Sequence, residues 1–197
     1  MPALPPITQA LLLINVALFA IDVLFGGLLT ALFALWPLGS GRFMPWQLVS
    51  YGFLHGSLGH LFFNMLGLWM FGSELERIWG GKRYLQFYFA SLLAAAAMQL
   101  LVTMLLGSPY PTVGASGALF GLLLAFGMMF PNRRIMLIFP PIPMKAKTFV
   151  IVFGGLELFF GVTGTQQGVA HFAHLGGMLG GYLMIRYWRG QPPFGRR

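Results

Sequence analysis

Long hydrophobic stretches alternate along the chain with short segments that are polar or rich in glycine and proline. The hydrocarbon core of a bilayer is about 30 Å thick, and about 20 mostly apolar helical residues are needed to cross it. Six stretches come close to that length, and they cover residues 9–30, 59–79, 84–107, 115–130, 148–163 and 170–188. The pattern therefore predicts an all-α membrane protein of six transmembrane helices, in a single domain that covers residues 1–197.

The segment 31–58, between the first two stretches, follows a different pattern. Proline and glycine recur within it, so it is not one continuous helix, yet it is too apolar to be a free loop in water. Its Trp36 and Trp46 are typical of a membrane–water interface. We expect this loop to lie in the headgroup region.

The composition favours a membrane protein over a soluble one. Of 197 residues, 57% are hydrophobic and only 8% are charged, whereas about a quarter of an ordinary soluble domain is charged. A mean hydropathy of +0.77 and 20 Phe exclude both a soluble globule and a disordered chain. The absence of cysteine excludes disulfides, thiolate metal sites, iron–sulfur clusters and a cysteine nucleophile.

The basic residues fall almost entirely on one side of the predicted membrane. The net charge is +8, and eleven of the twelve Lys and Arg residues lie between spans two and three, between spans four and five, or after span six. Only Arg42 lies on the other side, so the positive-inside rule places both termini in the cytoplasm. These charges mark topology, and we expect no nucleic-acid partner. The first span lacks a preceding basic residue and a small-residue cleavage site, so we expect it to be retained.

Polar side chains from three spans converge at one depth. Spans two, four and six run in the same direction, so their N-terminal ends all lie on the extracytoplasmic side. His60 and Asn64 stand one helical turn apart near the start of span two, Ser116 opens span four, and His174 lies near the start of span six. A hydroxyl, an imidazole and an amide supply the nucleophile, general base and oxyanion donors of nucleophilic acyl transfer.

Small residues lie on the helix faces that would bring these groups together. His174, Gly177 and Gly181 share one face of span six, and Gly117 and Gly121 form a G-x-x-x-G pair on span four. Small residues allow transmembrane helices to approach closely. We therefore expect the serine of span four to come within reach of the histidine of span six.

Other interpretations of these polar residues remain open at this point. A serine in a small-residue helix is often a packing residue, and each pair of histidines could instead bond to backbone groups or lipid headgroups. The four histidines could also bind a metal, but the chain has no thiol and no carboxylate is expected in their layer of the membrane. We therefore expect neither a metal nor another cofactor.

Four motifs make the sequence resemble the rhomboid family of intramembrane serine proteases. They are H-x-x-x-x-H-x-x-x-N over 55–64, a G-x-x-x-E turn over 72–76, GASGALFG over 114–121 and AHLGGMLGG over 173–181. The motifs occur in the family's order and at plausible spacings, and the resemblance covers roughly residues 40–185.

The resemblance implies a six-helix bundle with a Ser–His dyad and no third acidic member. Ser116 would attack the scissile carbonyl of a substrate's transmembrane segment, with His174 as general base and then general acid. The side chains of Asn64 and His60, together with the Ser116 backbone N–H, would hold the oxyanion.

The resemblance also implies roles for the loops. Segment 31–58 would be the family's half-submerged first loop, although the family often has Trp-Arg where this chain has Trp46 followed by Gln47. The polar loop 164–170 is a candidate lid over the site, and the fifth span is a candidate lateral gate for substrate.

Two acids lie within the predicted spans, where they are expensive in lipid. They are Asp22 in span one and Glu157 in span five. Glu157 could orient His174 as the acid of a triad, although we expect a structural hydrogen bond or a protonated carboxyl there. We interpret His55 and His171 as structural or supporting residues.

The leading hypothesis is an active intramembrane serine endopeptidase that acts on single-span or other membrane-protein substrates within the lipid bilayer. The alternative of a rhomboid-like pseudoprotease, which binds membrane clients without cleaving them, is disfavoured because Ser116 and His174 are both present. A small membrane transporter would carry polar residues across the whole membrane depth rather than in one outer layer. The compact six-span form suggests a prokaryotic inner membrane.

Overall fold

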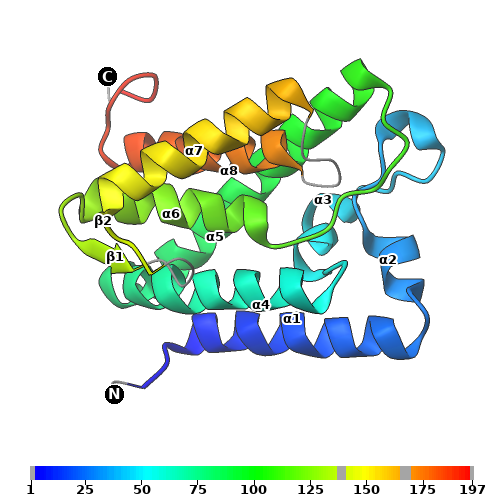
Figure 1. Cartoon of the computed structure of the whole chain (residues 1–197), viewed down its shortest axis with the longest axis horizontal. Helices are drawn as coiled ribbons and strands as arrows, with labels where there is room; N and C mark the ends of the chain where they lie inside the picture. Colours follow the sequence, from blue (N-terminus) through cyan, green and yellow to red (C-terminus); the bar gives the residue numbers. More distant parts are fainter. Residues whose placement is uncertain (1–2, 137–140, 165–169, 196–197) are drawn as a thin grey trace.

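The computed structural model describes residues 3–136, 141–164 and 170–195, which form a bundle of helices (Figure 1). The α-helices are α1 (Pro6–Leu24), α2 (Leu28–Phe33), α3 (Gln47–Ser50), α4 (Leu58–Gly67), α5 (Ser73–Leu106), α6 (Ser116–Met129), α7 (Ala146–Thr163) and α8 (His171–Trp188). Short helical turns complete the list, namely η1 (Leu38–Ser40), η2 (Tyr51–Phe53) and η3 (Leu68–Gly72). An antiparallel hairpin of β1 (Arg134–Met136) and β2 (Pro143–Lys145) joins α6 to α7 and is the one departure, within the described residues, from the predicted all-α fold.

The second and third predicted spans form one bent unit. The π-helical turn η3 joins α4 to α5, and the helical path then breaks at Gly80, whose φ of 74° and ψ of 159° lie outside the helical region. Glycine adopts such a backbone at little steric cost. The break falls between the two predicted stretches, 59–79 and 84–107, so the sequence located the turn correctly.

The first predicted span, 9–30, was wrong at its end, because α1 stops at Leu24. Gly26 and Gly27 have φ values of 63° and 85°, which turn the chain before α2 begins. The buried Asp22 carboxylate accepts hydrogen bonds from the backbone N–H and the hydroxyl of Thr30, and so ties α1 to α2 across this turn. Both carboxylate oxygens of Asp22, the acid predicted within span one, therefore accept a hydrogen bond from Thr30.

A second buried acid holds the other end of α1. Glu76, from the G-x-x-x-E turn, accepts hydrogen bonds from the backbone N–H groups of Ile7 and Thr8, at 3.0 and 2.7 Å. Its Oε2 also accepts from the Thr8 hydroxyl at 2.7 Å. The first turn of a helix has N–H groups without intrahelical partners, and a carboxylate both satisfies them and complements the helix dipole. This contact fixes α1 against the α4–α5 unit.

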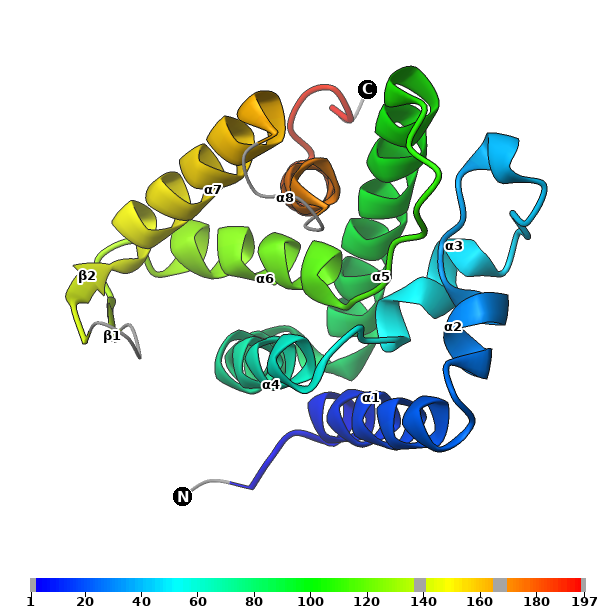
Figure 2. The same ribbon diagram turned by 45° about the vertical axis from the view of Figure 1, so that its right-hand side comes forward.

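Helix α8 packs between α5, α6 and α7, and Figure 2 shows it nearly end-on among them. Glycines allow this close packing. A Cβ built on Gly177 would overlap the carbonyl of Gly117, and one built on Gly181 would lie 3.2 Å from the Cα of Gly121. The predicted close approach of spans four and six is therefore confirmed at the level of backbone contact.

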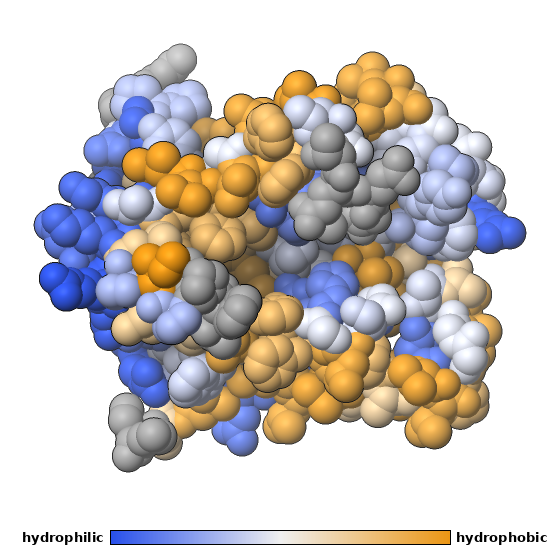
Figure 3. Space-filling view, in the orientation of Figure 1, coloured by the Kyte–Doolittle hydropathy of each residue, from blue (hydrophilic) through white to orange (hydrophobic). Residues whose placement is uncertain are grey.

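Among the described residues, three helical segments are long and apolar enough to cross a membrane, namely Pro6–Leu24, Leu58–Leu106 and Ala146–Thr163. The second has 49 residues and contains the bend at Gly80, whereas α6 is apolar but has only 14 residues. Figure 3 shows hydrophobic residues over much of one face of the molecule, with hydrophilic residues gathered at the left-hand end. In the same orientation both termini lie at that end (Figure 1).

Gln47 anchors the loop between α1 and α4. Its side chain is buried, and its Oε1 accepts hydrogen bonds from the backbone N–H groups of Trp36 and Met44 at 3.2 and 3.1 Å. Its Nε2 donates to the carbonyls of Leu32 and Arg42 at 3.2 and 3.1 Å. All four hydrogen-bonding positions of the amide are thus used, so the residue that departs from the family's Trp-Arg pattern ties four backbone groups of this segment together.

We expect Gln47→Ala to destabilise the protein, because four hydrogen bonds to backbone groups are lost at once. At about 0.5–1.5 kcal/mol for each net hydrogen bond, the free energy of unfolding should fall by about 2–6 kcal/mol. Unfolding in mixed micelles measures this, with Gln9→Ala as control because Gln9 is an exposed glutamine. An equal, small effect of both substitutions would contradict the anchoring role.

Candidate active site

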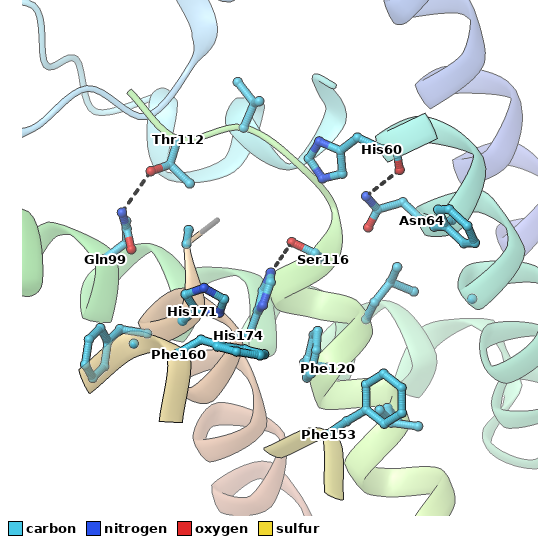
Figure 4. A pocket seen from close by; sticks show the side chains of 18 of the residues that line it. His60, Asn64, Gln99, Thr112, Ser116, Phe120, Phe153, Phe160, His171 and His174 are labelled. Atoms are coloured by element: carbon cyan, nitrogen blue, oxygen red, sulfur yellow. Dashed lines mark hydrogen bonds between the residues drawn. The ribbon is translucent and has the colours of Figure 1, made fainter. Parts of the chain in front are cut away.

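Ser116 and His174 are brought together at the N-terminal ends of two adjacent helices. Ser116 is the first residue of α6, and His174 lies in the first turn of α8. The Ser116 Oγ and the His174 Nε2 are 2.7 Å apart, a hydrogen bond in which the hydroxyl can donate to the imidazole (Figure 4). The contact between Gly117, directly after Ser116, and Gly177, one turn after His174, brings the two helices close enough for this bond.

Gly114 shapes the approach to Ser116. Its φ of 125° is strained for any residue with a side chain, and its N–H donates to the carbonyl of Tyr51 at 2.9 Å. A Cβ at this position would lie 2.7 Å from the Nε2 of His60 and 3.6 Å from the Ser116 Oγ. Glycine therefore leaves the space in which the His60 imidazole stands beside the serine.

His60 and Asn64 lie across the same cavity from the dyad, as Figure 4 shows. Ser57 caps α4 by accepting a hydrogen bond from the His60 N–H at 3.1 Å, which fixes where this helix begins. The Asn64 Nδ2 donates to the His60 carbonyl at 2.9 Å. An amide nitrogen carries two N–H donors, so this bond leaves the second available to a bound group.

Phe120 is a site residue that the sequence analysis missed. Its ring stacks on the His174 imidazole, with 4.3 Å between ring centroids and 8° between planes. The stack covers one face of the imidazole and restricts its rotation. The signal was present in the sequence, because Phe120 follows Ser116 by four residues and so shares its helix face.

Glu157 contacts both histidines of α8, and this corrects the expectation that no carboxylate lies in their layer. Its Oε2 is 2.6 Å from the His171 Nδ1, in a hydrogen bond, and 2.8 Å from the His174 Nδ1. The His174 Nδ1 is buried and has no hydrogen bond of good geometry within the described residues, so the second contact is close but not aligned. The sequence did not reveal how far α7 is turned about its axis, which decides where Glu157 points.

The same three residues could in principle hold a metal ion, since their ligand atoms lie within 4.8 Å of one another. Ligands about 2.0–2.1 Å from a tetrahedral zinc ion stand about 3.3 Å apart. The separations of 2.6 and 2.8 Å from the Glu157 oxygen are those of hydrogen-bonded groups instead. The geometry favours a carboxylate shared between two imidazoles.

His55 supports His60 from the loop before α4. Its ring is buried and meets the His60 ring edge-on, with 5.0 Å between centroids. Burial, and then the proximity of His60, lowers the pKa of His55 to about 3. His55 is therefore neutral at working pH and acts as a packing group behind the His60 imidazole.

The site lies in a cavity of about 1530 Å³ that also reaches down between α4, α6 and α7. Its polar part is formed by the dyad and the residues opposite it, and Phe153, Phe149 and Met136 continue the lining away from them. Figure 3 shows the hydrophobic face hollowed near its middle, with hydrophilic residues inside the hollow. Gly164 and Ala170 line the same cavity, whereas residues 165–169 of the predicted lid lie outside the described residues.

The sequence of this chain is similar to proteins of one family. The family model described as "Rhomboid domain" matches residues 42–190. "Rhomboid protease GluP" of Bacillus subtilis is 33% identical over 139 residues, which are 70% of this chain and 25% of that protein. "Rhomboid protein 1, mitochondrial" of Saccharomyces cerevisiae is also 33% identical, over 148 residues, or 70% of this chain and 40% of that protein.

"Rhomboid protease GlpG" of Yersinia pestis matches more of the chain at lower identity. It is 27% identical over 187 residues, which are 93% of this chain and 62% of that protein. The chain thus spans between a quarter and about three fifths of the length of these curated relatives.

Proposed function

This chain is an integral membrane protein of the rhomboid family, and we propose that it is an intramembrane serine endopeptidase. Its substrates would be membrane proteins, hydrolysed at peptide bonds in or next to their transmembrane segments. The observation that carries the proposal is the 2.7 Å contact between the Ser116 Oγ and the His174 Nε2 inside a cavity bounded by apolar helices. The names of the relatives from Bacillus and Yersinia, which include the word protease, support it.

In the proposed reaction, His174 Nε2 takes the proton of the Ser116 hydroxyl as Oγ attacks the scissile carbonyl. The developing oxyanion accepts hydrogen bonds from the Asn64 and His60 side chains and from the Ser116 N–H at the start of α6. His174 then protonates the leaving amine as the C–N bond breaks. A water molecule, deprotonated by His174, attacks the acyl-enzyme ester. The ester C–O bond then breaks, and His174 returns the proton to Oγ, which releases the second product and restores the Ser116 hydroxyl.

We also propose six membrane spans with both termini in the cytoplasm. The bend at Gly80 divides Leu58–Leu106 into two lengths, and α8 packs between α5, α6 and α7, which supports this count. The site would then lie near the extracytoplasmic face, where water is at hand. A substrate helix hides its amide bonds and must unwind to be cut.

Substrate entry between α4 and α7 is supported by the cavity, which both helices line. The likeness to relatives from Bacillus and Yersinia supports a prokaryotic inner membrane as the location.

The proposal is tested by reconstituting the protein in liposomes with a fluorescent single-span substrate that carries small, helix-destabilising residues near its outer end. We expect two products from one cleavage site, mapped by mass spectrometry, and labelling of Ser116 by a fluorophosphonate. Client binding without cleavage or labelling would indicate a pseudoprotease instead. Solute uptake without cleavage and without labelling would indicate a transporter.

We expect Asn64→Ala to lower kcat while leaving substrate binding largely intact, because the amide acts on the oxyanion rather than on the ground state. Loss of one such donor costs about 2.7–4 kcal/mol of transition-state stabilisation, or about 10²–10³ in kcat. Steady-state cleavage measures this, with Asn132→Ala as control because Asn132 is exposed in the turn before the β-hairpin. A rise in KM at constant kcat would assign Asn64 to substrate binding instead.

A further inference from the structure

We propose that Glu157 is a positioning residue for His174, an inference that rests on the proposed function of the dyad. Its carboxylate would hold the imidazole with the proton on Nδ1, so that the Nε2 lone pair faces Ser116. The three helices that meet at this point would each supply one group: Ser116 from α6, Glu157 from α7 and His174 from α8.

The contact that carries this inference is the 2.8 Å separation between the Glu157 Oε2 and the His174 Nδ1. The exposed fractions of the two side chains are 13% and 9%, so little water competes for either group. Interactions of a carboxylate in such a setting are screened far less than on a water-exposed surface. No other polar partner occupies this side of the imidazole within the described residues, because the His174 Nδ1 has no aligned hydrogen bond there.

The contact with Glu157 matters chemically because His174 can act as the base in only one of its two neutral tautomers. A neutral imidazole carries one proton, and the nitrogen without it is the one that accepts. His174 can take the Ser116 proton at Nε2 only when its own proton is on Nδ1, and a carboxylate next to Nδ1 favours that form. Hydrogen bonds at active sites are often poorly aligned before substrate binds and tighten afterwards, so the present angle is compatible with the role.

His171 explains why the carboxylate stays beside His174. The His171 Nδ1 contacts the same Oε2 at 2.6 Å, and its side chain is 5% exposed. Residues 171 and 174 are three apart on α8, so one oxygen of Glu157 is held between two rings on the same helix face. Together with the Phe120 stack, this arrangement restrains the catalytic imidazole from two sides.

The decisive variant is Glu157→Gln, which keeps the shape of the side chain. Its amide N–H₂ can donate to Nδ1 and so favours the wrong tautomer, which carries the proton on Nε2. We expect kcat to fall about 10²-fold, less than the roughly 10⁴-fold seen where a fully aligned triad acid is changed to its amide. KM should change less than about twofold, and Glu157→Asp should recover part of the lost kcat, because it keeps the carboxylate.

The matched control is Glu74→Gln, which neutralises a glutamate paired with Arg133 near the β-hairpin, away from the dyad. It should leave kcat at the wild-type value. Melting temperatures of all variants are measured in the same micelles, so that loss of folded protein is separated from loss of positioning. A Glu157→Gln variant that keeps wild-type kcat, or whose loss follows only its folded fraction, would overturn the proposal.

A second readout does not depend on turnover. The ¹⁵N NMR spectrum of protein labelled at histidine distinguishes Nδ1–H from Nε2–H, and His174→Gln identifies the His174 signals. We expect the Nδ1–H form in the wild type and a shift towards Nε2–H in Glu157→Gln. An unchanged tautomer would refute the positioning role even if the enzyme is active. A shifted tautomer in a protein that cleaves no substrate would leave positioning intact and refute the proposed function alone.

Discussion

Ser116→Ala should abolish cleavage of a transmembrane substrate, with kcat falling by about 10⁴–10⁶, because no other group replaces the hydroxyl that attacks the carbonyl. His174→Ala should cost about as much, since the hydroxyl is a poor nucleophile without the base 2.7 Å away. Both variants should remain folded, because each removes only a few atoms at the edge of a cavity.

The losses of kcat in Ser116→Ala and His174→Ala should not add when the two substitutions are combined. When two residues act as one catalytic unit, removing either one abolishes most of the contribution of both. The double variant should therefore be about as inactive as each single variant. Cleavage of the reconstituted single-span substrate and labelling by a fluorophosphonate measure the effect, with Ser108→Ala as a control for serine loss outside the dyad. Turnover that survives Ser116→Ala would refute the proposed mechanism, and labelling of that variant would point to another serine.

The parts of the fold that depend on local sequence could be predicted well. Helix positions follow from the length of apolar runs, and the close packing of α6 on α8 follows from glycines at helical spacing. The candidate nucleophile and base were found because the motifs keep them in a fixed relation to helix starts. The first helix was predicted to end six residues too late, because Gly26 and Gly27 lie inside a run that stays hydrophobic through the turn.

Features that depend on the rotation of one helix against another could not be predicted. Whether Glu157 faces lipid or the two histidines of α8 depends on how α7 is turned, and apolar residues surround it in the sequence on both sides. The anchoring role of Gln47 likewise depends on four backbone groups that the loop alone brings together. In both cases the folded structure brings the partners to the polar side chain, and the local pattern carries no trace of them.

Gly177→Ala should be the most damaging change outside the polar residues of the site. The added Cβ would overlap the carbonyl of Gly117, and that contact is with backbone, so no side chain can turn away to relieve it. Overpacking of this kind costs about 3 kcal/mol or more when the backbone itself must move. The melting temperature should fall, and activity should be lost even in the fraction that remains folded.

Activity should be lost because the contact lies next to the chemistry. Gly117 follows Ser116 directly, and Gly177 stands three residues beyond His174 on the same face of α8, so a wedge here separates the Oγ from the Nε2. Gly155→Ala is the matched control. A Cβ on Gly155 meets nothing within 4 Å, and alanine in a helix is favoured over glycine by about 0.5–1 kcal/mol, so this variant should be at least as stable as the wild type. If Gly177→Ala kept both stability and kcat, the two backbones would have room to separate without disturbing the dyad, and the glycine contact would not be what sets the distance between serine and histidine.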